Sequence, residues 1–462
     1  MFEKYRVIHF VGIGGIGMSG IAEVLANLGY EVTGSDKKES DTTKRLRGMG
    51  IRIHIGHREE NIDRAHVVVV SSAVPFDNPE VDAARRRSVP VIPRAEMLAE
   101  LGRLKYSILV AGAHGKTTTT SLISTVLGAG GLDPTIVIGG KLKAIGSNAK
   151  LGKGDFLVAE ADESDGSFLK LSPTIAVVTN IDREHMEFFK DMKALKDAFL
   201  SFINKVPFYG VSFICSENEH LRGLITGIHR RFLTYGLSAS SDIYATDIEK
   251  KFMETSFEVV MKGAGFGRFT VPVPGSHNVL NTLACIGVAN ELKIEPGRIR
   301  ESLASFGGIQ RRFEFKGEAK GIKVYDDYGH HPTEIRATLA AAADNLRYLG
   351  KDAGLYVVFQ PHRFTRTADL MDEFAGSFDG EYPVALLDIY PAGERPIEGV
   401  TAEALCEKLA KGGRRNVNYF PDREEAVRHL LRQLKAGDVM LTLGAGDVWK
   451  LGEKVLEKLH AL

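Results

Sequence analysis

Residues 106–120 read YSILVAGAHGKTTTT, and this stretch predicts the fold of the region around it. Tyr106–Ala111 is a run of apolar and β-forming residues, which predicts a buried strand. Gly112–Gly115 forms a glycine-bearing turn, and the helix predicted after it carries Leu122 and Leu127 on one side. A strand, a tight turn and a helix in this order are typical of an α/β domain with a mostly parallel sheet.

The same turn predicts a binding site for a nucleoside triphosphate. Its Gly-Lys-Thr fits the phosphate-binding pattern GxxxxGK[ST], except that Val110 stands where the first glycine belongs. In such a turn backbone amides hold the β-phosphate, the lysine reaches the β- and γ-phosphates, and the threonine hydroxyl binds Mg²⁺. The predicted contacts are Gly112, Ala113, His114, Gly115, Lys116, Thr117 and Thr118.

A second glycine turn lies near the N-terminus. Arg6–Val11 predicts a buried strand, and the GIGGIG that follows it (Gly12–Gly17) fits GxGxxG directly before a predicted helix. Small residues let the backbone approach a diphosphate, whose charge then lies on free N–H groups at the helix end. Asp36 follows the second predicted strand, where an acid would meet a ribose. By itself this turn is compatible with NAD, with another nucleotide diphosphate, or with no ligand.

The chain is long enough for three domains, since its 462 residues amount to about three times the roughly 150 residues of a typical domain. Short alternating segments at residues 242–273 predict an antiparallel meander, and FGGIQRRFEFK at residues 306–316 marks a boundary. We predict an α/β protein with three domains: a Rossmann-like domain (1–105), a P-loop domain with a small antiparallel sheet (106–310), and a second Rossmann-like domain (311–462). The predicted strands include Glu31–Thr33, Val67–Val70, Asp155–Glu160, Ile175–Thr179, Val211–Cys215, Ile322–Tyr325, Leu355–Phe359, Val384–Leu387 and Val439–Leu443, and helices are predicted at Arg94–Lys105 and Val279–Leu292.

The composition excludes several classes of protein. Lys and Arg number 59 and Asp and Glu number 59, and the resulting net charge of zero argues against a nucleic-acid coat or a polybasic membrane binder. No apolar run approaches the roughly 20 residues that cross a bilayer, and the first residues lead into a strand rather than a secretory signal. Three cysteines far apart in the sequence favour a reducing compartment over a disulfide scaffold. We expect a cytoplasmic protein with small-molecule substrates, and neither nucleic acid nor membrane as a partner.

Acidic and histidine side chains follow two further predicted strands. Glu160 ends one apolar run, and His185 follows the end of the next. Because the carboxyl ends of neighbouring parallel strands meet at one edge of a sheet, both side chains are expected beside the phosphate turn. Thr117, Glu160 and His185 are therefore the predicted Mg²⁺ ligands. The three acids that follow Glu160 are also compatible with a solvated loop: Asp162, Glu163 and Asp165.

Seven segments carry a resemblance to a known family. In chain order they are GIGGIGMSG (12–20), GAHGKTTTT (112–120), EADESD (160–165), TNIDREH (179–185), PGSHNVLN (274–281), YDDYGHHPTE (325–334) and QPHRFTR (360–366). This ordered set resembles the Mur ligases over essentially the whole chain. The resemblance implies a UDP-binding domain, a central ATPase and a C-terminal domain that closes over the site. It also implies an ATP- and Mg²⁺-dependent ligase that joins L-alanine to the lactoyl carboxylate of UDP-N-acetylmuramate through an acyl phosphate.

The resemblance further implies roles for individual residues. The N-terminal turn would bind the UDP part through Gly12, Gly14, Gly15, Gly17, Asp36, Ser71 and Ser72. His277, Asn278, Asn281 and Asp326 would join the phosphate turn in binding ATP. Lys116, His185 and Arg312 would be catalytic, with Arg312 reaching the phosphates. The amino acid would meet Tyr328, His330, His362, Arg363 and Arg366, since arginine forks suit a carboxylate.

The sequence departs from the family pattern at a few positions, and alternatives stay open. Ala113 stands where the family usually has threonine, and Glu184 and Glu187 stand where aspartates are more usual. Within the family, the enzyme could instead attach a pre-formed murein peptide, although residues 164–168 look like those of the alanine-adding members. Outside the family, an NAD-dependent oxidoreductase or a non-catalytic nucleotide-binding regulator would share the glycine turns.

Overall fold

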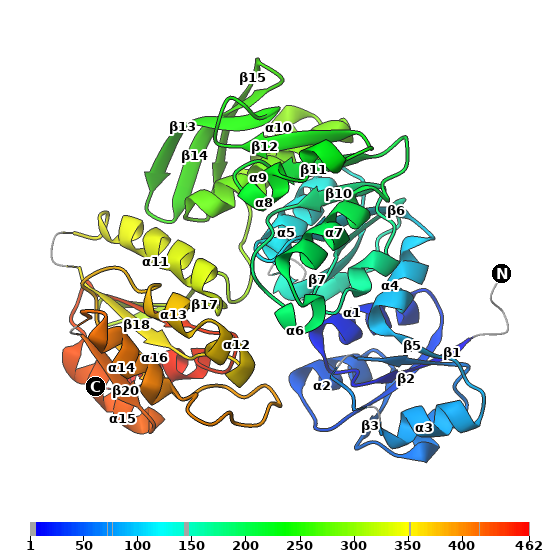
Figure 1. The fold of residues 1–462 in the computed structure, drawn as a ribbon, viewed down its shortest axis with the longest axis horizontal. Helices are drawn as coiled ribbons and strands as arrows, with labels where there is room; N and C mark the ends of the chain where they lie inside the picture. The colour runs from blue at the N-terminus through cyan, green and yellow to red at the C-terminus, as the bar shows by residue number, and fades with distance from the viewer. Residues whose placement is uncertain are drawn as a thin grey trace. The chain divides into compact units, whose positions relative to one another are not determined.

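The computed structural model describes residues 6–71, 73–75, 77–142, 147–350, 353–414 and 416–461. Their strands form three sheets, and helices lie against each sheet (Figure 1). The chain divides into two compact units, the first of which comprises Met1–Asp247, Phe257–Thr270 and Leu280–Gly307. The second comprises Ile248–Ser256, Val271–Val279 and Gly308–Leu462. The α/β class predicted from the sequence is confirmed.

The first sheet is built from the N-terminal residues. Its strands are β1 (Val7–Val11), β2 (Glu31–Asp36), β3 (Arg52–Ile55), β4 (Val67–Val70) and β5 (Val91–Pro93), and its helices are α1 (Ile16–Asn27), α2 (Asp41–Gly48), η1 (Glu59–Ile62), α3 (Pro79–Arg86) and α4 (Arg94–Gly102). The strands run parallel in the order β3-β2-β1-β4-β5, and all of β1 is buried. The chain order reverses between β1 and β4, and in open α/β sheets ligands bind beside the carboxyl ends of the strands at such a point.

A buried carboxylate stabilises the end of β2. Glu80, in the first turn of α3, has no exposed surface, and its Oε2 accepts a hydrogen bond from Ser35 Oγ at 2.5 Å. His57 Nδ1 lies 3.2 Å and His9 Nε2 lies 3.8 Å from the same oxygen. Burial by itself opposes ionisation, but the nearby His9 ring and the hydrogen bonds from Ser35 and Asn61 lower the pKa of Glu80 to about 2. The Glu80 carboxylate therefore fixes Ser35, the residue directly before Asp36.

The second sheet is larger and mixed. Its strands are β6 (Tyr106–Ala111), β7 (Thr135–Leu142), β8 (Ser147–Lys150), β9 (Phe156–Glu160), β10 (Ile175–Val178), β11 (Val211–Cys215), β12 (Phe232–Gly236), β13 (Ile243–Lys251), β14 (Glu254–Met261) and β15 (Ala264–Val271). They lie in the order β15-β14-β13-β12-β11-β10-β6-β9-β7-β8. The pairs β6–β9, β6–β10, β10–β11 and β7–β9 are parallel, so the ends of β6, β9 and β10 share one edge. β13 and β14 are joined by two residues, and so are β14 and β15. A parallel pair needs a connection of a dozen or more residues, so these two pairs are antiparallel, as predicted.

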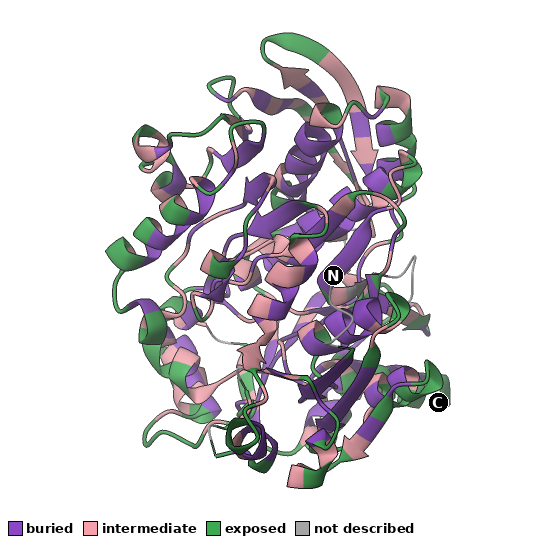
Figure 2. Cartoon of the chain, turned by 90° about the vertical axis from the view of Figure 1, so that its right-hand side faces the viewer, coloured by how far each residue is buried: buried purple, intermediate pink, exposed green. Residues whose placement is uncertain are grey.

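Helices cover the second sheet. They are α5 (Lys116–Ala129), η2 (Ser167–Lys170), α6 (Met186–Phe189), α7 (Met192–Ile203), α8 (Glu219–Arg222), η3 (Ile225–Gly227), α9 (Ser276–Glu291) and α10 (Pro296–Ala304). Residues 117–124 of α5 are all buried, and buried residues are concentrated along the strands in Figure 2. The predicted helix Val279–Leu292 corresponds to α9, which begins three residues earlier.

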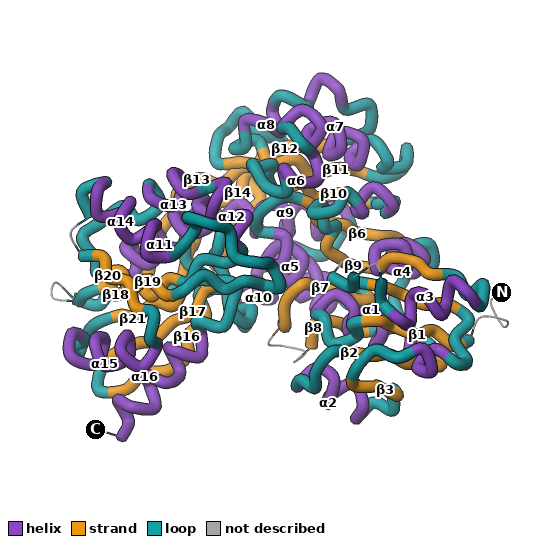
Figure 3. Tube along the Cα trace, turned by 60° about the horizontal axis from the view of Figure 1, so that its bottom comes forward, coloured by secondary structure: helices purple, strands orange, loops and turns teal. Residues whose placement is uncertain are grey.

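One helix of the first sheet packs on the second. Helix α1 lies beside β7 and β8 (Figure 3). Ser147 Oγ donates to Glu23 Oε2 at 3.0 Å, which joins β8 to α1 by a buried hydrogen bond. Gly20 allows the approach, because a Cβ there would lie only 3.1 Å from Asn148 Nδ2 and 3.2 Å from Ala149 Cβ.

The third sheet belongs to the second unit. Its strands are β16 (Glu314–Ala319), β17 (Ile322–Asp327), β18 (Leu355–Phe359), β19 (Val384–Leu387), β20 (Val417–Phe420) and β21 (Val439–Leu443), and its helices are α11 (Pro332–Leu346), α12 (Phe364–Asp369), α13 (Met371–Ala375), α14 (Ala402–Lys411), α15 (Arg423–Gln433) and α16 (Trp449–Ala461). The strand order is β16-β17-β21-β18-β19-β20, parallel except for β16–β17. Alternate residues of β18 enter different cores: Val357 and Phe359 belong to one cluster and Val358 to another, as two-sided burial requires.

Two segments of the predicted middle domain pack with the C-terminal residues. Lys250 Nζ lies 2.6 Å from Asp344 Oδ2, and the Met253 amide donates to Asn345 Oδ1 at 2.6 Å. The second unit therefore adds Ile248–Ser256 and Val271–Val279 to Gly308–Leu462, whose start lies close to the predicted boundary at residue 310. Among the described residues, no helix combines the length and the apolar character needed to cross a membrane.

Candidate functional site

The phosphate turn lies between β6 and α5, where two glycines adopt conformations that other residues disfavour. Gly112 has φ +134°, and a Cβ there would lie 2.1 Å from Thr179 Oγ1. Gly115 has φ +81°, and a Cβ there would lie 2.7 Å from Asn281 Oδ1. Positive φ is accessible to glycine at little cost, so these positions explain the two glycines of the motif. The turn leaves the start of α5 available for an anion.

The lysine of this turn is held by a buried carboxylate. Lys116 Nζ lies 3.0 and 2.8 Å from the two oxygens of Glu163, and it donates to the Gly112 carbonyl at 2.6 Å. The Glu163 side chain is only 2% exposed, which excludes the solvated-loop interpretation for this residue. Burial alone would lower the pKa of Lys116, but the carboxylates of Glu163 and Asp162 outweigh it and raise this pKa above its usual range. Lys116 is therefore a fixed positive charge.

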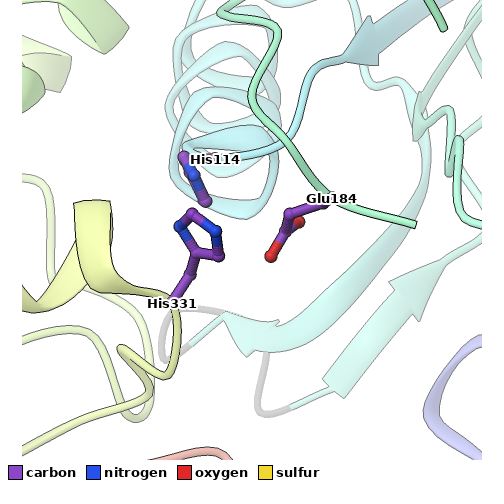
Figure 4. Close-up of side chains that lie close together, drawn as sticks. All are labelled: His114, Glu184 and His331. Carbon is purple, nitrogen blue, oxygen red and sulfur yellow. The ribbon is translucent and has the colours of Figure 1, made fainter. Parts of the chain in front are cut away.

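The loop after β10 orients the phosphate turn. The His114 amide donates to Asn180 Oδ1 at 2.8 Å, and its carbonyl accepts from Thr179 Oγ1 at 2.6 Å. The His114 ring lies 2.8 Å from Asp182 through Nε2 and Oδ2. Figure 4 shows the His114 side chain at the start of α5 and the Glu184 side chain on the loop that follows β10. The TNID segment thus has a structural role that the sequence alone did not indicate.

Three side chains at this edge could hold a metal ion. Ligand atoms of Glu163, Glu184 and His185 all lie within 4.8 Å of one another. Thr117, in the first turn of α5, is 7% exposed, whereas Glu160 Oε1 accepts a hydrogen bond from the Gly139 amide at 2.7 Å. Carboxylate and hydroxyl oxygens are the donors that Mg²⁺ prefers, so the residues present fit this ion. Sequence reasoning selected Thr117, Glu160 and His185, left Glu163 open between a ligand and a solvated loop, and gave Glu184 no metal-binding role.

The remaining predicted ATP contacts divide between the units. Asn281 Oδ1 accepts a hydrogen bond from Thr119 Oγ1 at 3.1 Å, which places it beside the phosphate turn. Asn278 is buried and donates to the Pro274 carbonyl at 2.7 Å, and His277 is exposed at the start of α9. In the second unit, Asp326 is fully buried and pairs with Arg311 Nε at 3.0 Å and Thr442 Oγ1 at 2.6 Å. Burial raises the pKa of Asp326 although Arg311 opposes the shift.

The two adjacent arginines of IQRRFE have different surroundings. Arg311 binds Asp326 and donates to the Gly446 carbonyl at 3.0 Å, so it has an internal structural role. The guanidinium of Arg312 lies 5.2 Å from the centre of the Tyr328 ring and 3.8 Å from Glu334 Oε1. Among the described residues, the side-chain hydrogen bonds to Asp326 and to the carbonyls of residues 445 and 446 are made by Arg311, and not by the predicted residue Arg312.

The N-terminal glycine turn is closed by an acid. The Gly14 amide donates to Asp36 Oδ2 at 2.8 Å, and a Cβ on Gly14 would lie 2.7 Å from the same oxygen. Gly12 has φ +80° and follows β1, while Gly15 is the N-cap residue of α1. Asp36 therefore supports the turn through its backbone. Ser72 lies outside the described residues, whereas Ser71 follows β4.

A cavity of about 270 Å³ opens beside this turn. It is lined from α1, β4, α4, β7 and the end of β9 by Gly15, Ile16, Gly17, Met18, Ser71, Arg94, Leu98, Val137, Ile138, Gly139, Glu160 and Asp162. Because these residues come from both sheets of the first unit, the cavity connects the N-terminal glycine turn with the acids that follow β9. It is large enough to admit part of a nucleotide sugar.

The predicted amino-acid residues gather at the carboxyl ends of β17 and β18. The rings of Tyr328 and His330 are 5.4 Å apart, and those of His330 and His362 are 5.8 Å apart. His362 in turn stacks on Tyr390 at 5.4 Å. Burial, followed by the charges of His330, Arg366 and Arg363, lowers the pKa of His362 to about 3. His362 is therefore neutral at physiological pH.

Arg363 stands next to this ring cluster in a constrained conformation. Its φ is +73°, and its Nε lies 2.5 Å from Glu394 Oε1. Thr365 Oγ1 donates to the same carboxylate at 2.7 Å, so Glu394 fixes the loop after β18. Glu394 lies far along the chain from this motif, and no local pattern in the sequence indicated it.

The fold and the phosphate turn define a class of protein: an α/β protein with three sheets, in which the second sheet along the chain carries a P-loop-like phosphate turn. Three family models match the chain: the Mur ligase family catalytic domain at residues 7–106, the Mur ligase middle domain at 110–289, and the Mur ligase glutamate ligase domain at 311–446. The chain belongs to the Mur ligase family. The resemblance inferred from the seven segments is confirmed.

Similar proteins extend over the full length. The UDP-N-acetylmuramate–L-alanine ligase of Geotalea uraniireducens is 57% identical over 459 residues, covering 99% of both chains. The crystal structure of the UDP-N-acetylmuramate–alanine ligase of Thermotoga maritima superposes with a TM-score of 0.83 at 29% identity, covering 98% of this chain and 99% of that one. A murein peptide ligase from Psychrobacter arcticus has a TM-score of 0.72 at 23% identity over 99% of both chains, which shows a shared fold alone.

Proposed function

We propose that this protein joins L-alanine to the lactoyl carboxylate of UDP-N-acetylmuramate, with conversion of ATP to ADP and phosphate, in peptidoglycan precursor synthesis. The observation that carries the proposal is full-length identity of 57% to a relative that bears this activity in its name. The phosphate turn with its fixed lysine supports the use of ATP. The cytoplasm, where such precursors are made, is the proposed location.

The domain assignment is part of the proposal. Residues 1–105 would bind the UDP-sugar, residues 106–310 would bind ATP, and residues 311–462 would bind the amino acid. Family models at 7–106, 110–289 and 311–446 support these limits. Gly12, Gly14, Gly15 and Gly17 would receive the diphosphate at the start of α1, since free N–H groups and the helix dipole favour an anion there.

The proposed chemistry follows from the charges of the reactants. A carboxylate is a poor acylating agent, so transfer of the γ-phosphoryl group first converts it to an acyl phosphate, which the amine of alanine then attacks. Both first reactants are anionic, and Lys116 would offset their repulsion. Bound Mg²⁺ would supply further positive charge at the phosphates. Its proposed ligands are Thr117, Glu160 and His185. Glu163 and Glu184 lie close to His185 and are two further candidate ligands.

The amino-acid end of the reaction is assigned to the second unit. Arg363 and Arg366 follow β18 and would bind the carboxylate of alanine, with Tyr328, His330 and the neutral His362 beside them. Planar guanidinium groups give two parallel hydrogen bonds to one carboxylate, which favours an amino acid over a simple amine. Arg312 is proposed to reach the phosphates.

A phosphate-release assay tests the proposal. The protein is incubated with ATP, Mg²⁺, UDP-N-acetylmuramate and one amino acid at a time, and L-alanine is expected to give the fastest release. Release that needs a murein tripeptide in place of alanine would identify the peptide-adding activity instead. Tight NAD(H) binding without phosphate release would favour an oxidoreductase. Lys116→Ala serves as the matched inactive control, expected to be slower by roughly 100- to 1,000-fold.

A further inference from the structure

Arg94 carries the positive charge in the cavity beside the N-terminal glycine turn. It opens α4, and it is the one basic residue among the described residues that line this cavity. The other charged residues of the lining are Glu160 and Asp162, both acidic. The Arg94 side chain is 24% exposed, so most of it is withdrawn from solvent while its head group faces the cavity. Neither sequence motif contains it.

The guanidinium lies directly over the glycine turn. A Cβ on Gly17 would lie 2.9 Å from Arg94 Nη1, 3.1 Å from its Cδ and 3.3 Å from its Cζ. Gly17 stands in the first turn of α1, where backbone N–H groups are free to bind an anion. The absence of a side chain at Gly17 therefore lets a fixed cation approach the helix end. A planar cation and helix N–H groups at one place form a site suited to phosphate oxygens.

An internal carboxylate occupies the cation in the described structure. Arg94 Nη2 lies 3.2 Å from Asp162 Oδ2. The Asp162 side chain is 40% exposed, and the loop that bears it also bears Glu163, which holds Lys116. Asp162 thus presents a negative charge where a ligand anion could take its place.

We propose that Arg94 binds the diphosphate of the UDP-sugar and that Asp162 holds Arg94 in position until the diphosphate replaces it. The inference rests on the proposed function, because it takes the sugar nucleotide as the occupant of the cavity. It assigns to α4 a binding residue beyond the glycine turn. The fork of Arg94 then spans the gap between the helix end and the diphosphate, while the cavity leaves room for the sugar.

Calorimetric titration of UDP-N-acetylmuramate and of UDP into the ATP-free protein tests the assignment. For Arg94→Ala we expect the Kd of both ligands to rise by roughly 10- to 100-fold, as for loss of a charge-assisted hydrogen bond. Arg94→Lys keeps the charge without the planar fork and is expected to bind with intermediate affinity. The Kd for ATP, measured separately, should stay within about twofold, since the loss is confined to the diphosphate contact. The matched control is Arg103→Ala on the same helix segment, where the side chain is 71% exposed and pairs with Glu100.

A second variant separates ligand binding from a structural ion pair. Asp162→Asn removes the internal partner of Arg94 and is expected to leave the UDP affinity unchanged or to raise it. If Arg94 acted only by holding Asp162, both variants would weaken binding equally and the double variant would add nothing further. Thermal unfolding of each variant verifies that the fold is retained.

The outcomes distinguish the two proposals. Wild-type protein that binds neither ligand would overturn the proposed function together with this assignment. Wild-type binding with an unchanged affinity in Arg94→Ala, or equal weakening by Asp162→Asn, would overturn the assignment alone. A loss seen with UDP-N-acetylmuramate and not with UDP would also overturn it, because Arg94 would then bind the lactoyl carboxylate rather than the diphosphate.

Discussion

Replacing Lys116 by alanine should weaken the fold as well as the reaction. The substitution leaves the Glu163 carboxylate, only 2% exposed, without the ammonium group that lies 2.8 Å away. Removing one partner of a buried ion pair typically costs about 3–5 kcal/mol of the free energy of unfolding. The lysine proposed to bind the phosphates of ATP is therefore also part of the protein's internal packing.

Protonation of Glu163 sets an upper limit to that cost. With Lys116 gone, burial is the main influence left and raises the pKa of Glu163 above its value in the unfolded chain. Neutralising a carboxyl of ordinary pKa, about 4.3, costs about 4 kcal/mol at pH 7.5 and about 2 kcal/mol at pH 5.5. A group whose pKa is raised on folding destabilises the fold as pH rises. The variant should therefore be about 3–4 kcal/mol less stable than wild type at pH 7.5 and no more than about 2 kcal/mol less stable at pH 5.5.

Urea unfolding followed by circular dichroism at both pH values measures the difference. Lys193→Ala is the matched control, since this lysine is 83% exposed and pairs with Asp197 on the surface. This substitution should leave the free energy of unfolding nearly unchanged at either pH, since solvent screens an exposed ion pair. Lys116→Met combined with Glu163→Leu should recover most of the lost stability. A loss below about 1 kcal/mol that does not change with pH would contradict the buried ion pair.

Three further predictions concern other parts of the molecule. Lowering the pH from about 4.5 towards 2 should destabilise the wild type by about 3 kcal/mol through Glu80. Its pKa is lowered to about 2 in the folded protein, so the Glu80 carboxylate stabilises the fold only while it is ionised. Thermal unfolding of Glu80→Gln should lack this part of the acid dependence. Gly112→Ala should lose at least about 1–3 kcal/mol and most ATP affinity, because φ is +134° and the new Cβ would meet Thr179; normal ATP titration would contradict the turn geometry. Arg363→Lys or Arg366→Lys should raise the KM for L-alanine roughly 10- to 150-fold and leave that for ATP unchanged, and steady-state kinetics with an alanine KM within about twofold of wild type would refute the assignment.

Local patterns predicted the fold well because burial on both faces leaves a clear signal in a parallel strand. The predicted strand Leu355–Phe359 matches β18 residue for residue, and Tyr106–Ala111 matches β6. The helix predicted from Val279 begins at Ser276, inside the segment PGSHNVLN, since polar residues in a first turn carry no apolar periodicity. Fold class and strand positions are thus accessible from sequence.

The partners of the predicted site residues were not accessible. The sequence places Asp162, Glu163 and Asp165 in one acidic loop, and only packing distinguishes the buried Glu163 that holds Lys116. In the same way, Arg311 and Arg312 are indistinguishable as letters. In the structure, Arg311 has a φ of +61°, and its side chain pairs with the buried Asp326. Such choices depend on residues distant in the chain, which no local motif contains.

The seating of α1 on the β7–β8 hairpin determines which fragments of this chain can exist by themselves. Cutting after residue 105 would separate α1 from β7 and β8, and β8, the edge strand of its sheet, would lose the helix that packs beside it and could pair with another chain. A fragment that retains both sheets of the first unit keeps the contact of α1 with β7 and β8 buried. Truncations for biophysical work should therefore preserve α1 and β8 together, and a library of N-terminal deletions should show soluble expression collapsing as soon as the helix is removed.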